Sequence, residues 1–590
     1  MSSKQLALAY AALDRSLSKD ELAVRLEHAT QHLQDVFEPQ LVVRTSTSDS
    51  TGIISWDVAE PTCSWPQFST DESLGSAVWL HVPTIAGAPV DGVDATKTAF
   101  AVNNGKIDAP DVGAPFASIS IDNSGILRIA NDVFGMARIF RFDFDGLTVW
   151  STRSGLAHVF AGVQPKVNTA AWQSMATLGW SARGLSHMGD GRQLPPHSLT
   201  IARPYSLPKV ESKLDQWLTN ANTDPPAELS QSADDMRRSL ETVKHWKSRP
   251  VADLSGGKDS RVIAAAGIRA NAIQAVRTVR TDHGEVETAE HLMEIIGRPV
   301  EHRIQDLAPP KAIQGGVTQR LAGQHQLWEG YYLARTAYRA PLLNGVRRSD
   351  SARLNGLGGE AIQGGSIMSE TWRNRIIEGG FPIAQKRLVA MARGPLGATE
   401  DSREQTAETL LRLADESRRL DWRSATSSVD YVYNFDKMPY WSNNFGSSES
   451  VLPYYSPAML KHIAQTFNHL QPYGEMHRQL LRALIPEWAE VPFYKPSQKS
   501  RATIHIWEFE DWSQARGLLL DRMELARSFD TNALANILDI VDTGEGNVHH
   551  ETALTRALWE ITFYDHVSNI GAQAQRVNDD LARQSGTYIL

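Results

Sequence analysis

The sequence predicts an α/β protein of two domains: an antiparallel β-sandwich followed by a doubly wound parallel sheet with many helices. Two patterns predict it. Between residues 117 and 151, short alternating strand patterns are separated by turn sequences, which is typical of stacked antiparallel sheets. From residue 251 onward, strand and helix patterns alternate, which is typical of a parallel sheet covered by helices on both faces.

Residues 1–40 are expected to form a helical extension. Leu6, Tyr10, Leu13 and Leu17 recur at helical spacing, which favours an amphipathic helix over a secretion signal. The sequence Ser-Lys-Asp-Glu at 18–21 has the form of a capping box, so it predicts the start of a second helix.

Residues 41–207 are expected to form the sandwich. Strands are predicted at 117–121, 126–130, 136–142 and 147–151, and a further strand resumes after the two prolines within 194–200. Residues 208–228 are polar and contain Asp, Asn and Pro, which favours a linker between the domains.

Residues 229–590 are expected to form the second domain. A helix at 229–247 precedes a short buried strand at 251–254, a Gly-rich loop and another helix. A second strand is predicted at 272–279, and a helix at 285–297 ends on Gly297. The rest is mostly helical in pattern, with loops rich in Trp and Tyr at 428–456.

Composition excludes several classes of protein. The net charge is -9 and the pI is near 6.1, which argues against a nucleic-acid-binding protein. Cys63 is the only cysteine, so internal disulfides and multi-cysteine metal sites are excluded, and a cytoplasmic location is the simplest expectation. No apolar run approaches the roughly 18 residues of a membrane span.

The loop after the strand at 251–254 reads Ser-Gly-Gly-Lys-Asp-Ser, residues 255–260. The loop before a helix presents backbone N–H groups at the positive end of the helix dipole. Its glycines let an anion approach the backbone closely. Asp259 would repel a bare phosphate, which suggests a metal ion between carboxylate and phosphate. The spacing is not that of the Walker loop.

This loop resembles the pyrophosphate loop of the ATP pyrophosphatase superfamily, whose members cleave ATP between the α and β phosphates. The turn Leu-Asn-Gly-Leu-Gly-Gly-Glu, residues 354–360, resembles a second signature of the asparagine synthetase family. The resemblance implies that ATP and Mg²⁺ are cofactors and that Asp259 and Glu360 hold the metal. Family members usually carry aspartate where this chain has Glu360, and often an acid where it has Ala361.

Two further stretches resemble the same family. Residues 449–457 are similar to its Glu-x-Arg-x-Pro-Phe-x-Asp segment and retain Glu449. Residues 131–140 and 151–156 resemble its glutamine amidotransferase domain, which has the Ntn fold. A working glutaminase of this type has cysteine at position 2, where this chain has Ser2. A serine without an evident base is a poor replacement nucleophile, so we expect no ammonia from glutamine.

Two branches of the family lack this cysteine, the β-lactam synthetases and the lasso peptide cyclases. Both adenylate a carboxylate, which an amine of the same molecule then attacks. The resemblance assigns the nucleotide to Leu254, Ser255, Gly256, Gly257, Asp259, Ser260, Thr278 and Gly358. It implies Lys495, rather than Lys499, as the lysine that offsets developing charge, Asp436 as the base for the amine, and Glu449 as a further catalytic or loop-bracing residue.

The expected function is therefore an AMP-forming amide synthetase acting on a small molecule or peptide with a carboxylate and an amine, for example in lasso-type macrolactam formation. A β-lactam-synthetase-like ligase and a non-catalytic nucleotide-binding scaffold are the alternatives. A tRNA-modifying pyrophosphatase would need basic patches and paired cysteines, which the sequence lacks. A homodimer or a partner protein of the same pathway stays open.

Overall fold

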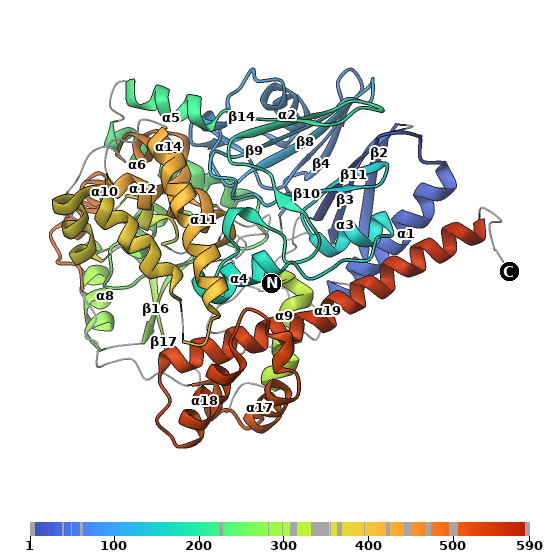
Figure 1. The fold of residues 1–590 in the computed structure, drawn as a ribbon. Coiled ribbons are helices and arrows are strands. Elements are labelled where there is room, and N and C mark those ends of the chain that lie inside the picture. The colour runs from blue at the N-terminus through green and yellow to red at the C-terminus, as the bar shows by residue number, and fades with distance from the viewer. Residues whose placement is uncertain are drawn as a thin grey trace.

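We describe the protein from a computed structural model of the whole chain. The description excludes short segments throughout the sequence, which are residues 1–5, 38–39, 49, 59–62, 224–227, 281–282, 298, 307–315, 332–352, 355, 363–368, 395, 420–424, 442–450, 467–471, 473, 495–504 and 585–590. The remaining residues form an N-terminal part with antiparallel sheets and a helix-rich C-terminal part with a parallel sheet (Figure 1).

The N-terminal part contains two six-stranded antiparallel sheets, as the sequence predicts. One has the order β12-β10-β11-β1-β3-β2, and the other has the order β14-β13-β9-β8-β5-β4. The strands are β1 (Leu6–Ala12), β2 (Leu41–Thr47), β3 (Thr51–Val58), β4 (Phe68–Asp71), β5 (Gly75–Trp79), β8 (Ala117–Asp122), β9 (Leu127–Asn131), β10 (Phe140–Phe144), β11 (Leu147–Ser151), β12 (Arg192–Gln193), β13 (Ser198–Ala202) and β14 (Lys209–Ser212). A short hairpin, β6 (Thr84–Ile85) and β7 (Ala88–Pro89), lies outside them.

Helices cover the outer faces of the two sheets. Helices α1 (Lys19–Val36) and α3 (Ser154–Ala161) pack together on the sheet that contains β11, and α2 (Ala95–Asn103) packs on β5 and β8. An apolar cluster that includes Ile53, Val78 and Ile119 fills the space between the sheets. The result is four layers, in the order helix, sheet, sheet, helix.

The predicted helix over the first residues is wrong, because Leu6–Ala12 forms the strand β1 in the interior of a sheet. Leu6, Leu8 and Tyr10 face the helices, whereas the alternating alanines face the other sheet. Every residue of β1 is buried. A strand buried on both faces shows no alternation of polar and apolar residues, so the helical spacing of Leu6 and Tyr10 is a chance pattern.

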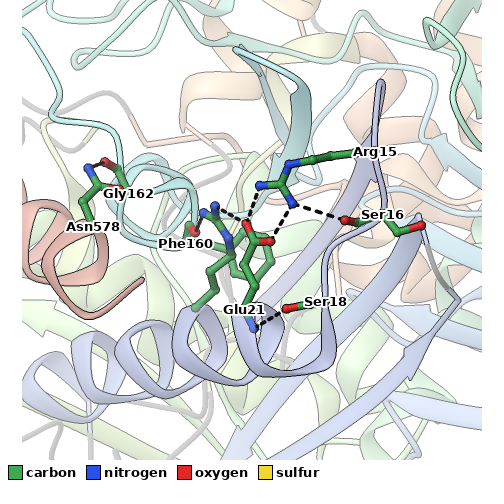
Figure 2. A network of polar contacts seen from close by, with 8 residues as sticks. Arg15, Ser16, Ser18, Glu21, Phe160, Gly162 and Asn578 are labelled. Carbon is green, nitrogen blue, oxygen red and sulfur yellow. Dashed lines mark hydrogen bonds and ion pairs between the residues drawn. The ribbon is translucent and has the colours of Figure 1, made fainter. Parts of the chain in front are cut away.

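The predicted second helix is confirmed as α1. The Ser18 side chain accepts a hydrogen bond from the backbone N–H of Glu21 at 3.0 Å. The Glu21 carboxylate also accepts hydrogen bonds from Arg15, as Figure 2 shows, and from Arg25. The figure shows further that Asn578, in the last helix, donates to the carbonyl of Gly162 at the end of α3.

The predicted linker at 208–228 is wrong for most of its length. Lys209–Ser212 forms the edge strand β14, paired antiparallel with β13, and α5 (Leu214–Thr223) follows at once. Leu214, Leu218 and Ala221 of α5 are buried. The polar composition reflects an edge strand and a helix with one exposed face, because edge strands carry polar and charged side chains.

The C-terminal part contains the predicted parallel sheet, with the order β17-β16-β15-β18. Its strands are β15 (Val251–Asp253), β16 (Ala275–Arg280), β17 (Glu301–Asp306) and β18 (Arg353–Leu354). Helices α7 (Asp259–Arg269) and α8 (His283–Ile296) connect the first three strands. The chain order reverses between β15 and β18, and ligands of such sheets bind outside the carboxyl ends of the strands at this switch point.

Further helices lie elsewhere along the chain. They are α4 (Thr169–Leu178), α6 (Leu229–Ser239), α9 (Val317–Trp328), α10 (Glu370–Ala392), α11 (Glu400–Arg419), α12 (Ala425–Val432), α13 (Met438–Trp441), α14 (Pro457–Thr466), α15 (Glu475–Leu484), α16 (Pro486–Ala489), α17 (Trp512–Asp521), α18 (Thr531–Asp542) and α19 (Val548–Gln584). Figure 1 shows α19 running from α17 and α18 past α9 to α1, so it contacts both parts of the chain. Among the described residues, none of these helices is long and apolar enough to span a membrane.

Candidate functional site

The loop between β15 and α7 is held in shape by its own hydroxyl groups. Ser255 Oγ lies 2.7 Å from Ser260 Oγ, and it accepts a hydrogen bond from the Gly257 N–H at 3.2 Å. The Leu254 N–H donates to the Arg277 carbonyl at 2.8 Å. The two serines thus fix the loop, and the backbone of Gly256 and Gly257 forms its outer turn.

A segment far along the chain closes one side of this loop. The Gly256 carbonyl accepts from the buried Arg261 guanidinium and from the Tyr494 N–H, both at 2.8 Å. Arg261 also donates to the carbonyl of Val491 at 2.7 Å. A Cβ atom at Gly256 would lie 2.5 Å from Tyr494 Cβ, so only glycine fits where the two segments meet.

The loop leads directly into the N-terminus of α7, whose first residue is Asp259. Lys258 at the N-cap position makes no side-chain capping bond. The first backbone N–H groups of a helix have no intrahelical acceptor and carry the positive end of the dipole. The loop and the first turn therefore offer hydrogen-bond donors to an anion.

The second Gly-rich turn packs against this first helical turn. A Cβ at Gly356 would lie 2.6 Å from the Ser260 nitrogen, and one at Gly359 would lie 2.6 Å from Asp259 Cβ. Gly358 has a φ of +92° and is covered by the Tyr455 ring. The glycines thus let the two loops touch, and the short helix η7 (Gly359–Ile362) brings Glu360 toward Asp259.

Glu360 and Asp259, the two predicted metal ligands, form an electrostatic pair. Burial raises the pKa of Glu360, and the negative charge of Asp259 raises it further. The buried Glu360 Oε2 has no hydrogen-bond partner among the described residues. A cation between the two carboxylates would offset the burial of Glu360 and its repulsion by Asp259. Mg²⁺ typically binds one or two protein carboxylates together with phosphate and water. Within the described residues there is no cluster of three or more metal-binding side chains.

His477, which the sequence analysis missed, supports Asp259 from α15. Its Nε2 lies 2.7 Å from Asp259 Oδ1, and the imidazole is fully buried. Burial lowers the pKa of His477 despite the raising effect of Asp259, and the charge of Lys258 lowers it too. No sequence signal links His477 to a loop more than 200 residues upstream.

Thr278 lies in β16 next to the loop, but its hydroxyl is already engaged. Thr278 Oγ1 donates to the Leu254 carbonyl at 2.8 Å and lies 2.8 Å from His302 Nε2. Because a hydroxyl has one proton to donate, the His302 ring must donate to it. Thr278 and Leu254 thus support the loop from its buried side, since both side chains are buried.

Asp436 does not join the two metal-type carboxylates. One of its oxygens accepts from Trp180 Nε1 at 2.8 Å, and the other accepts from the Arg183 N–H. Burial raises its pKa to about 6. Asp436 also lines a cavity of about 300 Å³ between the two parts of the chain. These contacts anchor Asp436, and its role as the base for an amine stays a prediction.

Lys437, the next residue, interacts electrostatically with Glu360, and its Nζ lies over the rings of Tyr433 and Trp180. Burial lowers its pKa to about 8, and Glu360 is the charged group that opposes this shift. The sequence analysis passed over Lys437 because nothing in the local pattern separates it from a solvated lysine.

Lys495, Lys499, Glu449 and Ser2 lie outside the described residues. Their neighbours are informative. Tyr494, directly before Lys495, donates to Gly256 as described above, and Tyr454 donates its hydroxyl to the Asp259 carbonyl at 2.9 Å. The segment that leads to Lys495 and the segment that follows Glu449 thus both contact the loop or the first turn after it.

Comparison of the sequence with protein-family models and with curated proteins gives no match. The function is therefore inferred from the geometry of the site and from the motifs that the sequence contains.

Proposed function

We propose that the protein is an ATP-dependent, AMP-forming amide synthetase of the asparagine synthetase type. The observation that carries the proposal is the meeting of two loops at the switch point of the parallel sheet. One loop offers backbone N–H groups and two serine hydroxyls at a helix N-terminus. The other brings Glu360, with an unsatisfied buried oxygen, to Asp259. A pyrophosphate needs such hydrogen-bond donors, and a divalent cation needs such carboxylate ligands.

The residues divide into roles accordingly. Ser255, Gly256, Gly257 and Ser260 would bind the β and γ phosphates of ATP, and Asp259 and Glu360 would hold Mg²⁺. A bound Mg²⁺ would offset the charge of the pyrophosphate leaving group. Lys495 is retained as a charge-stabilising residue because the chain is tied to the loop at Tyr494.

The proposed reaction has two steps. A carboxylate oxygen of the substrate attacks the α-phosphorus, and the bond between the α-phosphorus and the bridging oxygen breaks, so that pyrophosphate leaves with the electron pair. An amine nitrogen then attacks the acyl carbon, AMP leaves, and the amine loses a proton. The substrate is a small molecule or peptide that carries a carboxylate and, in the lasso-type version, also the amine.

We propose that the N-terminal four-layer part is of the Ntn amidotransferase type without glutaminase activity. The order of its layers, with two antiparallel sheets between helices, supports the comparison. β1 begins at Leu6, so a strand follows the N-terminus as it would in that fold. The absence of a cysteine at position 2 supports the loss of activity.

Calorimetric titration with MgATP tests the proposal, followed by measurement of products with candidate acids and amines. We expect wild type to bind MgATP and to release AMP and pyrophosphate. Asp259→Asn and Glu360→Gln should each lose most of the Mg²⁺ dependence, whereas the control Asp306→Asn, on the edge strand β17, should not. Release of ADP and phosphate, or no binding of MgATP by wild type, would overturn the proposal.

A further inference from the structure

Arg261, in the first turn of α7, joins the Gly-rich loop to a segment far along the chain. Its side chain is fully buried. Its two terminal nitrogens donate four hydrogen bonds, and every acceptor is a main-chain carbonyl. These carbonyls belong to Gly256 at 2.8 Å, Val491 at 2.7 Å, Pro492 at 3.1 Å and Trp488 at 3.3 Å. The guanidinium thus holds the segment 488–494 against the loop.

The positive charge of Arg261 has no ionic partner in the part of the chain that the structure describes. No carboxylate there lies within 4.0 Å of the guanidinium. By contrast, the buried Arg153 pairs with Glu329 at 3.1 Å. Arginine stays protonated in proteins, and charged side chains are almost never fully buried unless they are paired. Carbonyl oxygens satisfy its N–H groups but carry no net charge, so the charge stays unbalanced.

A second unbalanced guanidinium, that of Arg478 in α15, lies on the same aromatic ring. Cζ of Arg261 is 4.9 Å from the centre of the Phe493 ring, and Cζ of Arg478 is 5.2 Å from it. Among the described residues, Arg478 also has no carboxylate within 4.0 Å, whereas Arg482, one turn later, pairs with Glu475 at 3.4 Å. The ring offsets only part of the repulsion between two like charges, so an anion nearby would be stabilised.

The ring that carries both guanidiniums lies beside the Gly-rich loop. A Cβ at Gly474, the N-cap of α15, would lie 3.4 Å from the Phe493 ring and 3.7 Å from Lys258 Cδ. The side chain of a loop residue therefore reaches the same place as the ring. The carboxylate of the loop, that of Asp259, contacts His477 at 2.7 Å and lies more than 4.0 Å from both guanidiniums.

We propose that Arg261 is a positioning residue of the Gly-rich loop, and that Arg261 and Arg478 together supply positive charge that a bound pyrophosphate balances. The inference rests on the proposed function and deepens it, because both arginines lie outside the loop motif at 255–260. Arg261 acts on the anion through Gly256, whose carbonyl it binds. Because Arg261 is removed from water, solvent and salt weaken its attraction for an anion less than that of an exposed side chain.

Arg478→Gln tests the charge without disturbing a hydrogen bond, since the Arg478 side chain makes none with the described residues. A unit charge that acts over about 10 Å in a protein changes an affinity by about tenfold, and partial exposure reduces this. We expect calorimetric binding of Mg-pyrophosphate to weaken about threefold to tenfold, with an unchanged melting temperature. Arg482→Gln, in the same helix but at a balanced charge, should stay within about twofold of wild type. Equal affinities of the two variants would overturn the role of the charge.

Two substitutions of Arg261 separate its charge from its packing. Arg261→Lys keeps the charge and three N–H donors, whereas Arg261→Gln keeps two donors and no charge. We expect Arg261→Lys to bind Mg-pyrophosphate within about threefold of wild type and Arg261→Gln to bind it at least about tenfold more weakly. Arg269→Gln, at an exposed position in the last turn of α7, is the matched control and should bind like wild type.

A merely structural Arg261 would give a different result, because both variants would then lose affinity in step with their melting temperatures. That result, or an Arg261→Gln protein that binds like wild type, would overturn the inference. If Arg261→Gln is poorly folded, the comparison of Arg478→Gln with Arg482→Gln still decides the role of the charge. If wild type binds neither Mg-pyrophosphate nor MgATP, the proposed function itself fails. If wild type binds both and every arginine variant binds equally well, only this inference fails.

Discussion

Replacing Gly359 by alanine tests the packing on which the whole site depends. The added Cβ would lie 2.6 Å from both Cβ and Cγ of Asp259. Asp259 cannot move freely, because its Oδ1 lies 2.7 Å from Nε2 of the buried His477. The backbone of Gly359 needs no left-handed conformation, so the effect is steric alone. Either the turn that carries Glu360 or the Asp259 carboxylate must shift.

The expected size follows from similar overpacking in proteins, which typically costs about 1–3 kcal/mol. If most of that cost falls on the geometry of the two carboxylates, MgATP binding should weaken by about tenfold to a hundredfold, since about 1.4 kcal/mol is tenfold in affinity. Isothermal calorimetry gives the affinity, and a thermal melt of the same sample shows whether the fold is intact.

Two other glycine-to-alanine variants, in which the added Cβ meets fewer atoms, should affect MgATP binding less. A Cβ at Gly257 meets only Ser255 Oγ, at 3.2 Å, and one at Gly517 in α17 meets nothing within 4 Å. Gly257→Ala should therefore have a smaller effect on MgATP binding than Gly359→Ala. Gly517→Ala should leave binding unchanged and raise the melting temperature slightly, because alanine favours helix. A Gly359→Ala protein that melts and binds MgATP like wild type would refute the contact between the two loops.

Three further predictions concern the rest of the molecule. Burial raises the pKa of Glu560 to about 8, so its ionisation on the folded chain costs nothing below about pH 4.5 and grows to about 5 kcal/mol above pH 8. Glu560→Gln should thus raise the melting temperature at pH 9 but not at pH 5, and equal shifts at both would contradict the assignment. The fully buried Asp132 accepts four backbone N–H bonds, from Phe116, Phe134, Met136 and Ala137. Asp132→Asn should destabilise the protein by several kcal/mol, because one acceptor oxygen becomes a donor facing a donor; a melting temperature like that of wild type would count against this network. Finally, the purified protein should release no ammonia from glutamine in a coupled assay, and release that survives removal of contaminating enzymes would show that another residue replaces the missing cysteine.

The sequence was sufficient where structure is local. The Gly-rich loop, the helix after it, the parallel strands at 251–254 and 272–279, and the helix ending at Gly297 were all predictable, because turn glycines and apolar periods act over a few residues. The antiparallel strands between 117 and 151 were also predictable, although β10 starts at Phe140 rather than at 136.

The sequence failed where the neighbours are distant. β1 was read as helix because both of its faces are buried, so the burial pattern that identifies a strand was missing. His477 and Lys437 come from segments about 180 to 220 residues after the loop, and no local period marks them. Asp436 was assigned its role as a base from the family resemblance, which did not show that Trp180 binds its carboxylate.

The two parts of the chain are joined by a buried ion pair and by hydrogen bonds between the end of α9 and the start of α3. Glu329, at the end of α9, accepts N–H bonds from Ser154 and Gly155 at the start of α3 and pairs with Arg153 at 3.1 Å, with both charges buried. Removing one partner of such a buried pair leaves an uncompensated charge, which costs more than the pair itself contributes. The same first part clamps Asp436 through Trp180. In the proposed function, the second part would therefore depend on the first part for its fold, so the first part would stay necessary without a glutaminase reaction.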